Sequence, residues 1–347
     1  MTGKPRRSIL VLCLAAAAAL AAPARADKIT LRLADGMPSG HIIDRLVIEP
    51  FMKQVAAATQ GQVEIQHFPA EQLGKSRDLL LLTEAGVTDI GFIVPSYVAD
   101  RLPLSAVTEL PGIFQTTCQG NAALRSLLGD GGILNEAEFK PNGIRPLIVF
   151  LMPAYQLVLS SSRPLEGIKA VAGLKIRTPG GAMDLTARAL SAVPIRLSPP
   201  EIYESMSRGT LDGALLSYQS VTSYHLPALL KSGTTGLDFG TVAITFSIST
   251  KAWEALPPDI RKIVGDIGWK ISEGACTEFD RAEDASIATV RKANVRLMEP
   301  VDTDKAQLAE VFGRVRAEWA RRLDARGKPG SQVLAEFLQA ADEARSQ

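Results

Sequence analysis

The sequence has few of the residues that metal and cofactor sites need. Its 347 residues include three cysteines and three histidines. The histidines, His41, His67 and His225, lie far apart in the chain, and none has a cysteine or carboxylate near it at the spacing of metal ligands. The sequence therefore predicts no metal site, and nothing in it calls for a cofactor.

Local motifs of several enzyme classes are also missing. The chain has no Gly-x-Ser-x-Gly, no Ser-x-x-Lys, no His-Glu-x-x-His and no Gly-x-x-x-x-Gly-Lys. These absences argue against a catalytic function, and we expect that the protein is not an enzyme. They leave open an α/β enzyme whose nucleophile has no local motif.

Only one apolar run is long enough to draw attention, and it lies at the N-terminus. Lys4, Arg6 and Arg7 are basic, residues 9–22 are apolar, and residues 24–26 read Ala-Arg-Ala. This order predicts a signal peptide over residues 1–26, cleaved after Ala26, and a periplasmic protein that does not insert into the membrane after cleavage. The segment holds four of the 38 basic residues and none of the 37 acidic residues. The mature chain therefore keeps 34 basic and 37 acidic residues. A formal charge near −3 gives no reason to expect nucleic acid as a partner.

Two cysteines remain after cleavage. Cys118 and Cys276 enter an oxidising compartment, where a disulfide is possible. Since they lie far apart in the sequence, two free and buried thiols are the interpretation that we favour at this point.

Strand and helix patterns alternate along the rest of the chain, whose length of about 320 residues suits two domains. Apolar alternation or short apolar runs predict strands over residues 29–33, 63–68, 89–94, 144–151, 156–160, 174–177, 195–197, 211–216 and 241–250. Helical spacing predicts helices over residues 44–59, 76–84, 182–191, 259–293, 305–326 and 331–344, and Ser198-Pro199-Pro200-Glu201 caps one more. The alternation indicates parallel βαβ units, and the helix over 259–293 is long enough to run along both domains.

Polar and aromatic side chains follow the ends of several of these strands. They lie in the segments 35–41, 94–97, 153–155, 177–178 and 216–219. Ligands of open α/β sheets collect at the carboxyl ends of the strands, so these segments predict a cleft between the domains. Arg177 follows such a strand, and its planar fork of donors suits a carboxylate. From the local sequence alone, a solvated arginine on an edge strand is the interpretation that we favour.

An ordered set of short motifs resembles the DctP-type solute receptors of tripartite ATP-independent periplasmic (TRAP) transporters. The motifs cover essentially the whole chain after the signal peptide: Phe68-Pro69-Ala70-x-Gln72-Leu73-Gly74, Glu109-Leu110-Pro111 with Phe114, Gly173-Leu174-Lys175-Ile176-Arg177 with Pro179, Pro194-Ile195, Glu201-x-Tyr203, Gly209-x-Leu211-Asp212-Gly213 and Trp253-x-x-Leu256-Pro257.

The resemblance implies a fold and an anchor for the ligand. The fold is α/β, with the two-domain architecture of periplasmic binding proteins, a cleft between the domains and a long helix spanning both. We place domain I at 27–152 plus about 242–281, and domain II at 153–241 plus about 282–347. The resemblance also gives Arg177 the role of forming a salt bridge with the ligand carboxylate.

Two departures from the sialic-acid-binding members bear on the ligand. Leu157 stands where those members carry a second ligand-contacting arginine, and Ala214 to Tyr218 replace their Gln-Glu-Asn. Apolar groups in these places favour a monocarboxylate with an apolar or aromatic body over an acidic sugar. The residues expected to bind it are Arg177, Tyr155, Tyr218, Ser217, Tyr97, Ser96, Asp35, His41, Leu157 and Leu216.

The function favoured by the sequence is therefore a receptor that captures a small organic acid and delivers it to the membrane permease subunits of a TRAP transporter. Two alternatives remain at this stage. One is the exported enzyme, which steady turnover of a ligand would reveal. The other is a receptor that serves a sensor kinase or an ABC importer, since capture follows the same physics whatever the downstream partner.

Overall fold

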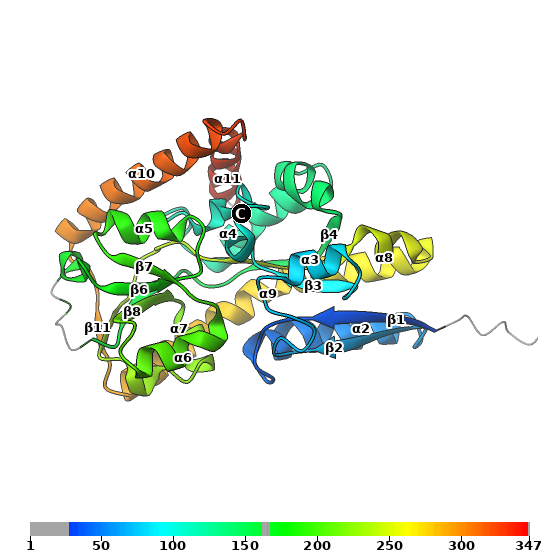
Figure 1. Cartoon of the computed structure of the whole chain (residues 1–347), viewed down its shortest axis with the longest axis horizontal. Coiled ribbons are helices and arrows are strands. Elements are labelled where there is room, and N and C mark those ends of the chain that lie inside the picture. The colour runs from blue at the N-terminus through cyan, green and yellow to red at the C-terminus, as the bar shows by residue number, and fades with distance from the viewer. Residues whose placement is uncertain (1–27, 162–164, 166, 346–347) are drawn as a thin grey trace, which may run out of the picture.

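The structure, a computed structural model, describes residues 28–161, 165 and 167–345. The predicted signal peptide, residues 1–26, lies outside this part of the chain. Two β-sheets flanked by helices lie next to each other along the long axis of the molecule (Figure 1). The α/β class predicted from the sequence is confirmed. Among the described residues, no helix combines the length and the apolar character that crossing a membrane requires.

The first sheet has the strand order β2-β1-β3-β10-β4. Its strands are β1 (Ile29–Ala34), β2 (Val63–Phe68), β3 (Ile90–Ile93), β4 (Ile144–Leu151) and β10 (Ala243–Ser249). β1 pairs in parallel with β2 and β3, as the alternation of strands and helices predicted, whereas β10 runs antiparallel to β3 and β4. The chain thus returns from the second sheet to place β10 between two strands of the first.

The second sheet has the order β11-β9-β5-β8-β6-β7. Its strands are β5 (Gln156–Leu159), β6 (Lys175–Thr178), β7 (Val193–Arg196), β8 (Gly213–Leu216), β9 (Ser232–Thr234) and β11 (Arg296–Met298). β6 lies in the interior of the sheet, parallel to both β7 and β8. The residue at the carboxyl end of β6 therefore faces the edge at which parallel strands present their ligands.

Helices and short helical turns connect and cover the sheets (Figure 1). The longer ones are α2 (Glu49–Ala58), α3 (Leu79–Glu84), α4 (Thr117–Leu128), α5 (Met183–Ala189), α6 (Pro199–Ser207), α7 (Tyr218–Ser223), α8 (Thr250–Ala255), α9 (Pro258–Lys292), α10 (Asp302–Asp324) and α11 (Gly330–Arg345). The turns are η2 (Asp44–Ile48), η3 (Pro95–Val98), η4 (Ser105–Glu109), η5 (Asn135–Phe139), η6 (Lys140–Asn142), η7 (Ile168–Val171) and η8 (Pro227–Leu229). The predicted capping box of Ser198 and Glu201 opens α6. The helix predicted from residue 76 begins only at Leu79, as α3, and the hydroxyl of Ser76, at the predicted start, donates to the Glu71 carboxylate.

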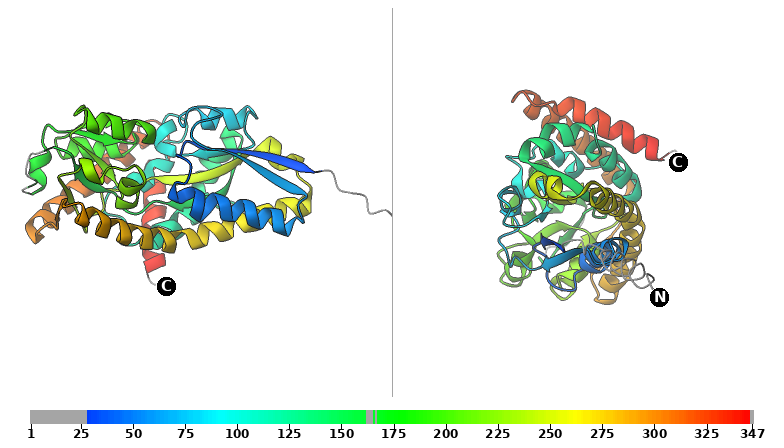
Figure 2. Two further views of the ribbon diagram at one scale, coloured as in Figure 1. Left: turned by 90° about the horizontal axis from the view of Figure 1, so that it is seen from below. Right: turned by 90° about the vertical axis from the view of Figure 1, so that its right-hand side faces the viewer.

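The long helix α9 runs along both sheets, as its length predicted (Figure 2, left). Near its middle, Ser272 Oγ accepts a hydrogen bond of 2.8 Å from the amide of Val149 in β4. Further along, the Glu283 carboxylate accepts bonds of 2.8 Å from the amides of Tyr218 and Gln219 at the start of α7. These polar contacts tie one rigid element to both halves of the molecule.

A disulfide joins α4 to α9, which corrects the expectation of free thiols. Cys118 and Cys276 are bonded, with their Cα atoms 4.9 Å apart. The two helices pack side by side although 158 residues separate the two cysteines in the chain. Distance along the sequence was therefore a poor guide to distance in space.

The proposed domain boundaries remain a prediction. The chain crosses between the sheets in the segments 152–155 and 235–242 and along α9. The last helix packs next to the first sheet, because α11 lies against α4 and Gln119 Nε2 donates to the carbonyl oxygen of Ala341 over 2.8 Å. α10 contacts both α11 and α5 and so passes from one half of the molecule to the other.

Candidate ligand-binding site

Arg177 is a buried arginine at the carboxyl end of β6. Its side chain is 2% exposed, although Lys175, two residues earlier on the same face of the strand, is exposed. Residues of both sheets surround the cavity at the end of β6, whereas the strand is exposed at its start. Arg177 is thus a cation held between the two sheets.

Neutral groups hold one side of the guanidinium. Arg177 Nε donates to the carbonyl oxygen of Leu197, 2.9 Å away, and Nη1 lies 3.5 Å from the carbonyl oxygen of Leu215. Within the part of the chain that the structure describes, Arg177 forms no ion pair. A buried charge without a counter-charge is costly, so the site favours an anion that completes it.

A small enclosed cavity lies against this guanidinium, between the two sheets. Its volume is about 20 Å³, which suits about one water molecule. The first sheet and its connections contribute Met37, Ile43, Phe92, Val94, Tyr97, Met152, Val242 and Ile244; the second contributes Tyr155, Arg177, Pro199, Leu216, Ser220 and Tyr224. A molecule much larger than water would fit there only if the surrounding walls moved apart.

Two tyrosines share the cavity with Arg177. Tyr97 lies in η3, and Tyr155 lies just before β5. Burial raises the pKa of both phenols, while the nearby charge and hydrogen bonding of Arg177 act in the opposite direction. Both hydroxyls therefore stay protonated at neutral pH and can donate to an anion held by Arg177.

The remaining lining is mostly apolar. Apart from Arg177, the described side chains around the cavity carry no charge, and the hydroxyls of Ser220 and the tyrosines are its other polar groups. Aliphatic, methionine and phenylalanine side chains form the rest of the wall. This arrangement can hold one anionic group and an apolar body, with little to satisfy the hydroxyls of a sugar.

The sequence expectations agree with this geometry for four of the residues that they named. Arg177, Tyr97, Tyr155 and Leu216 line the cavity. Ser96 and Leu157 are buried next to it without lining it. The geometry thus brings together the anchor, two of the three expected tyrosines and one apolar residue.

Tyr218 and Ser217 differ from the expectation. The hydroxyl of Tyr218 donates to the carbonyl oxygen of Thr234 over 2.7 Å, on the side of the sheet that faces α9. Ser217 Oγ pairs with Ser220 Oγ. β8 ends at Leu216 and α7 begins at Tyr218, so the chain turns there, and neither Ser217 nor Tyr218 lines the cavity, although Ser217 contacts the lining residue Ser220.

Asp35 and His41 do not line the cavity but contact residues that do. Asp35 Oδ1 accepts the amide of Met37, a residue of the wall, over 2.6 Å. The His41 ring stacks on Tyr224, with the ring centroids 5.6 Å apart. Burial lowers the pKa of His41 to about 4, so the ring is neutral at physiological pH.

Tyr224 is the functional candidate that sequence reasoning missed. Its ring lines the cavity together with Ser220. The signal was available, because the two residues stand four positions apart, on one face of a helical segment. His225, the next residue, is exposed.

A buried carboxylate joins the two halves beside this site. Glu109, at the end of η4, accepts the amide of Ala182 over 2.7 Å, and Ala182 directly precedes α5. Gly181 has a φ of +58°, and a Cβ on it would meet the Glu109 carboxylate at 2.0 Å, so the close approach requires glycine. Burial raises the pKa of Glu109 to about 8.

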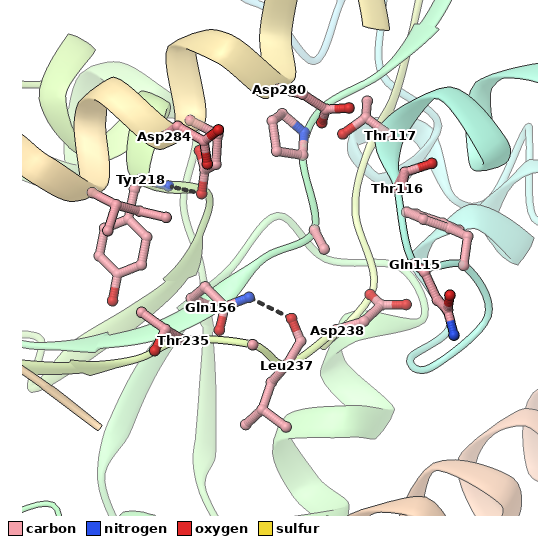
Figure 3. A pocket seen from close by; sticks show the side chains of 16 residues that line it. Gln115, Thr116, Thr117, Gln156, Tyr218, Thr235, Leu237, Asp238, Asp280 and Asp284 are labelled. Atoms are coloured by element: carbon pink, nitrogen blue, oxygen red, sulfur yellow. Dashed lines mark hydrogen bonds between the residues drawn. The ribbon is translucent and has the colours of Figure 1, made fainter. Parts of the chain in front are cut away.

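A larger cavity, of about 580 Å³, lies on the α9 side of the connections between the sheets (Figure 3). Gln156, whose side-chain amide bonds to the carbonyl oxygen of Leu237, forms part of its wall, and Asp238, Asp280 and Asp284 surround it (Figure 3). Four carboxylates, including Glu283, and no Lys or Arg among the described residues line it. An organic anion would be repelled there, so its size does not make this cavity the candidate site.

Comparisons with known proteins agree with the fold. The family model of bacterial extracellular solute-binding proteins, family 7 (DctP), matches residues 33–322. The uncharacterized protein YiiZ of Salmonella typhimurium is 27% identical over 256 residues, which are 71% of this chain and 75% of that protein.

Two solved structures illustrate the range of ligands among similar folds. A TRAP solute-binding protein from Rhodoferax ferrireducens, in complex with copurified benzoate, superposes with a TM-score of 0.85 at 21% identity and covers 92% of this chain and 99% of its own. A TRAP periplasmic solute-binding protein from Sulfitobacter, with bound β-D-galacturonate, superposes with a TM-score of 0.77 at 20% identity. The match covers 89% of this chain and 99% of that protein.

Proposed function

This chain belongs to family 7 of the bacterial extracellular solute-binding proteins, the DctP family of TRAP solute receptors, and we propose that its ligand is a small monocarboxylate with an apolar or aromatic body. In this proposal the mature protein acts in the periplasm and delivers the acid to the membrane permease subunits of a TRAP transporter. Members of this family are receptors, which fits a chain without local catalytic motifs.

The observation that carries the proposal is Arg177, a buried guanidinium whose hydrogen-bond partners among the described residues are all neutral. A carboxylate placed between the Nη atoms of Arg177 and the hydroxyls of Tyr97 and Tyr155 would satisfy the charge and accept hydrogen bonds on both sides. Such a pair is stronger out of water than in it, because fewer solvent dipoles screen it. Lysine would not reproduce the planar geometry.

The walls support the choice of an apolar body. The cavity surrounds Arg177 with Phe92, Met152, Leu216 and other apolar side chains. A sugar acid would bury several hydroxyls against these groups, and each unpaired polar group costs about 1 to 3 kcal/mol. The benzoate complex of the Rhodoferax protein provides an example of such an acid in a similar fold.

Ligand capture would shift the protein from an open to a closed arrangement of its two halves, each built on one of the two sheets. In the structure, residues of both sheets surround Arg177, as a closed form would require, and the cavity of about 20 Å³ is too small for an aromatic acid. An acid that contacts residues of both sheets favours the arrangement in which both reach it. We therefore expect the acid to enter an open form and to widen the cavity of the closed one.

A ligand screen by thermal shift tests the proposal. The purified mature protein is heated alone and with benzoate, 3-hydroxybenzoate, mandelate, branched aliphatic acids, succinate, galacturonate and sialic acid. We expect one of the aromatic or branched monoacids to raise the melting temperature most, because binding to the native state stabilises it. Greater stabilisation by succinate or by either sugar acid than by every monoacid would contradict the apolar pocket.

A further inference from the structure

Three side chains with metal-binding atoms meet where β1 and β2 end. Asp35 follows β1, His67 lies near the end of β2, and Asp44 begins η2. One ligand atom from each lies within 4.8 Å of the other two. His67 Nε2 and Asp35 Oδ2 are 2.5 Å apart.

The two carboxylates are deeply buried beside one imidazole, which contacts Asp35. Asp35 is 0% and Asp44 4% exposed. In the described ranges, no Lys or Arg pairs with either carboxylate, so one protonated imidazole would still leave a net negative charge among them. Buried carboxylates without enough positive charge are costly unless a cation joins them.

An unused ligand atom gives a second, independent indication. Asp44 Oδ2 accepts the amide of Gly40 over 2.8 Å, but Asp44 Oδ1 is buried without any hydrogen-bond partner. A buried oxygen of this kind normally has a partner. Its presence beside a second carboxylate and an imidazole points to a missing positive group.

We propose that Asp35, Asp44 and His67 bind a divalent transition-metal ion, for which Zn²⁺ is the best match. Zn²⁺ takes carboxylate oxygens and imidazole nitrogens at about 2.0 to 2.2 Å, and three protein ligands leave a fourth position for water. Ligand atoms around such an ion lie about 3.4 Å apart, so modest side-chain rotations would complete the site. The mixed nitrogen and oxygen set favours Zn²⁺ over Mg²⁺ or Ca²⁺.

The site would fasten a wall of the ligand cavity. The segment between Asp35 and Asp44 carries Met37 and Ile43, and both line the cavity beside Arg177. A metal ion would join the two ends of this segment to β2. The metal site does not rest on the proposed organic ligand, since none of its three residues lines the cavity.

Metal titration of the whole mature protein tests the inference. The protein is stripped with a chelator, dialysed and titrated calorimetrically with ZnCl₂ in the absence of organic acids. We expect one ion per chain, a melting temperature that rises with Zn²⁺ and falls back with chelator, and a visible absorption band when Co²⁺ replaces Zn²⁺. Asp44→Asn and His67→Gln should each weaken Zn²⁺ binding at least about tenfold, which is the loss typical even for groups that only support a ligand.

Matched controls separate this site from adventitious binding. His225→Gln and Asp78→Asn remove an exposed histidine and an exposed carboxylate, and both should leave the Zn²⁺ affinity unchanged. Failure of the wild-type protein to bind Zn²⁺ or Co²⁺ stoichiometrically would overturn the proposal, and this measurement needs no variant. Equal Zn²⁺ affinity of the wild type and the folded Asp44→Asn and His67→Gln proteins would overturn it as well. Acid binding by the metal-free protein reports separately on the site of Arg177.

Discussion

Arg177 Nε donates to the carbonyl oxygen of Leu197 across 2.9 Å, and this bond orients the guanidinium of the buried arginine. Because Nε is occupied by the backbone beyond β7, the Nη side of the fork is directed toward the cavity and its two tyrosines. A neutral partner fixes the geometry without cancelling the charge. The arrangement thus keeps the cation oriented and available for a carboxylate.

The first prediction concerns Arg177→Ala. Removing the charged partner of a desolvated carboxylate typically costs about 2 to 5 kcal/mol, or about 30-fold to 5000-fold in Kd. We expect the acid identified by the screen to lose its calorimetric binding and its thermal stabilisation. Arg177→Lys should recover only part of the affinity, because lysine keeps the charge and loses the fork.

The matched control is Arg188→Ala, which removes an exposed arginine from α5 and should leave the acid affinity unchanged. The melting temperature of unliganded Arg177→Ala should stay within a few degrees of the wild type. A much larger drop would mean that Arg177 has a structural role, and retained acid binding would remove it from the site.

A second prediction distinguishes among the tyrosines. Tyr97→Phe and Tyr155→Phe each remove a hydroxyl beside Arg177, and a hydrogen bond to a charged group contributes about 1.5 to 3 kcal/mol. Each should weaken acid binding by about 10- to 150-fold in calorimetric titrations. Tyr218→Phe should leave it unchanged, since that hydroxyl donates to the carbonyl oxygen of Thr234. The opposite ranking would place the ligand next to Tyr218 and contradict a site in the cavity of Arg177.

Local patterns predicted most of the framework, because their physical causes are local. Alternation placed the strands over 63–68 and 144–151 as the structure has them, and the Ser198 capping box marks the start of α6. The three-residue strands β9 and β11 escaped detection, since so short a run carries no periodicity.

Sequence and structure agree on those residues of the candidate site whose position depends on the end of a strand. They differ on residues whose position depends on packing between distant segments. Arg177 follows directly from the end of β6. The exchange of Tyr218 for Tyr224 depends on the turn between β8 and α7, which the sequence does not reveal at single-residue resolution. The grouping of His67 with Asp35 arises from the pairing of β1 with β2, so spacing along the chain could not show it.

Glu109 leads to a prediction about pH. Its pKa is raised to about 8 in the folded protein, against about 4.3 for a solvated glutamate, because burial disfavours the carboxylate. The folded state therefore holds this proton more tightly than the unfolded state does. The stability that this provides is complete below pH 4.3 and is lost as the pH rises toward 8. We expect the melting temperature to fall over this range.

Glu109→Gln isolates this contribution. Glutamine keeps an oxygen that can accept the Ala182 amide and does not titrate, so the decline in melting temperature between pH 5 and pH 8 should be shallower in the variant. Glu283 and Asp238, whose pKa values burial raises to about 7 and about 6, remain in both proteins and cancel in the comparison. Parallel profiles would show that Glu109 is not buried as a protonated group in solution.

The disulfide between α4 and α9 leads to the last prediction. Cross-links over long loops stabilise a fold by about 2 to 4 kcal/mol, largely by restricting the unfolded chain, and this one closes a loop of 158 residues. Reductant should therefore lower the melting temperature of the wild type, while the doubly substituted Cys118→Ser, Cys276→Ser protein should start lower and not respond to reductant. Acid affinity should be the same in both, because neither cysteine lines the cavity of Arg177. A melting temperature indifferent to reductant in the wild type, with the bond verified as reduced, would show that helix packing alone holds α4 on α9.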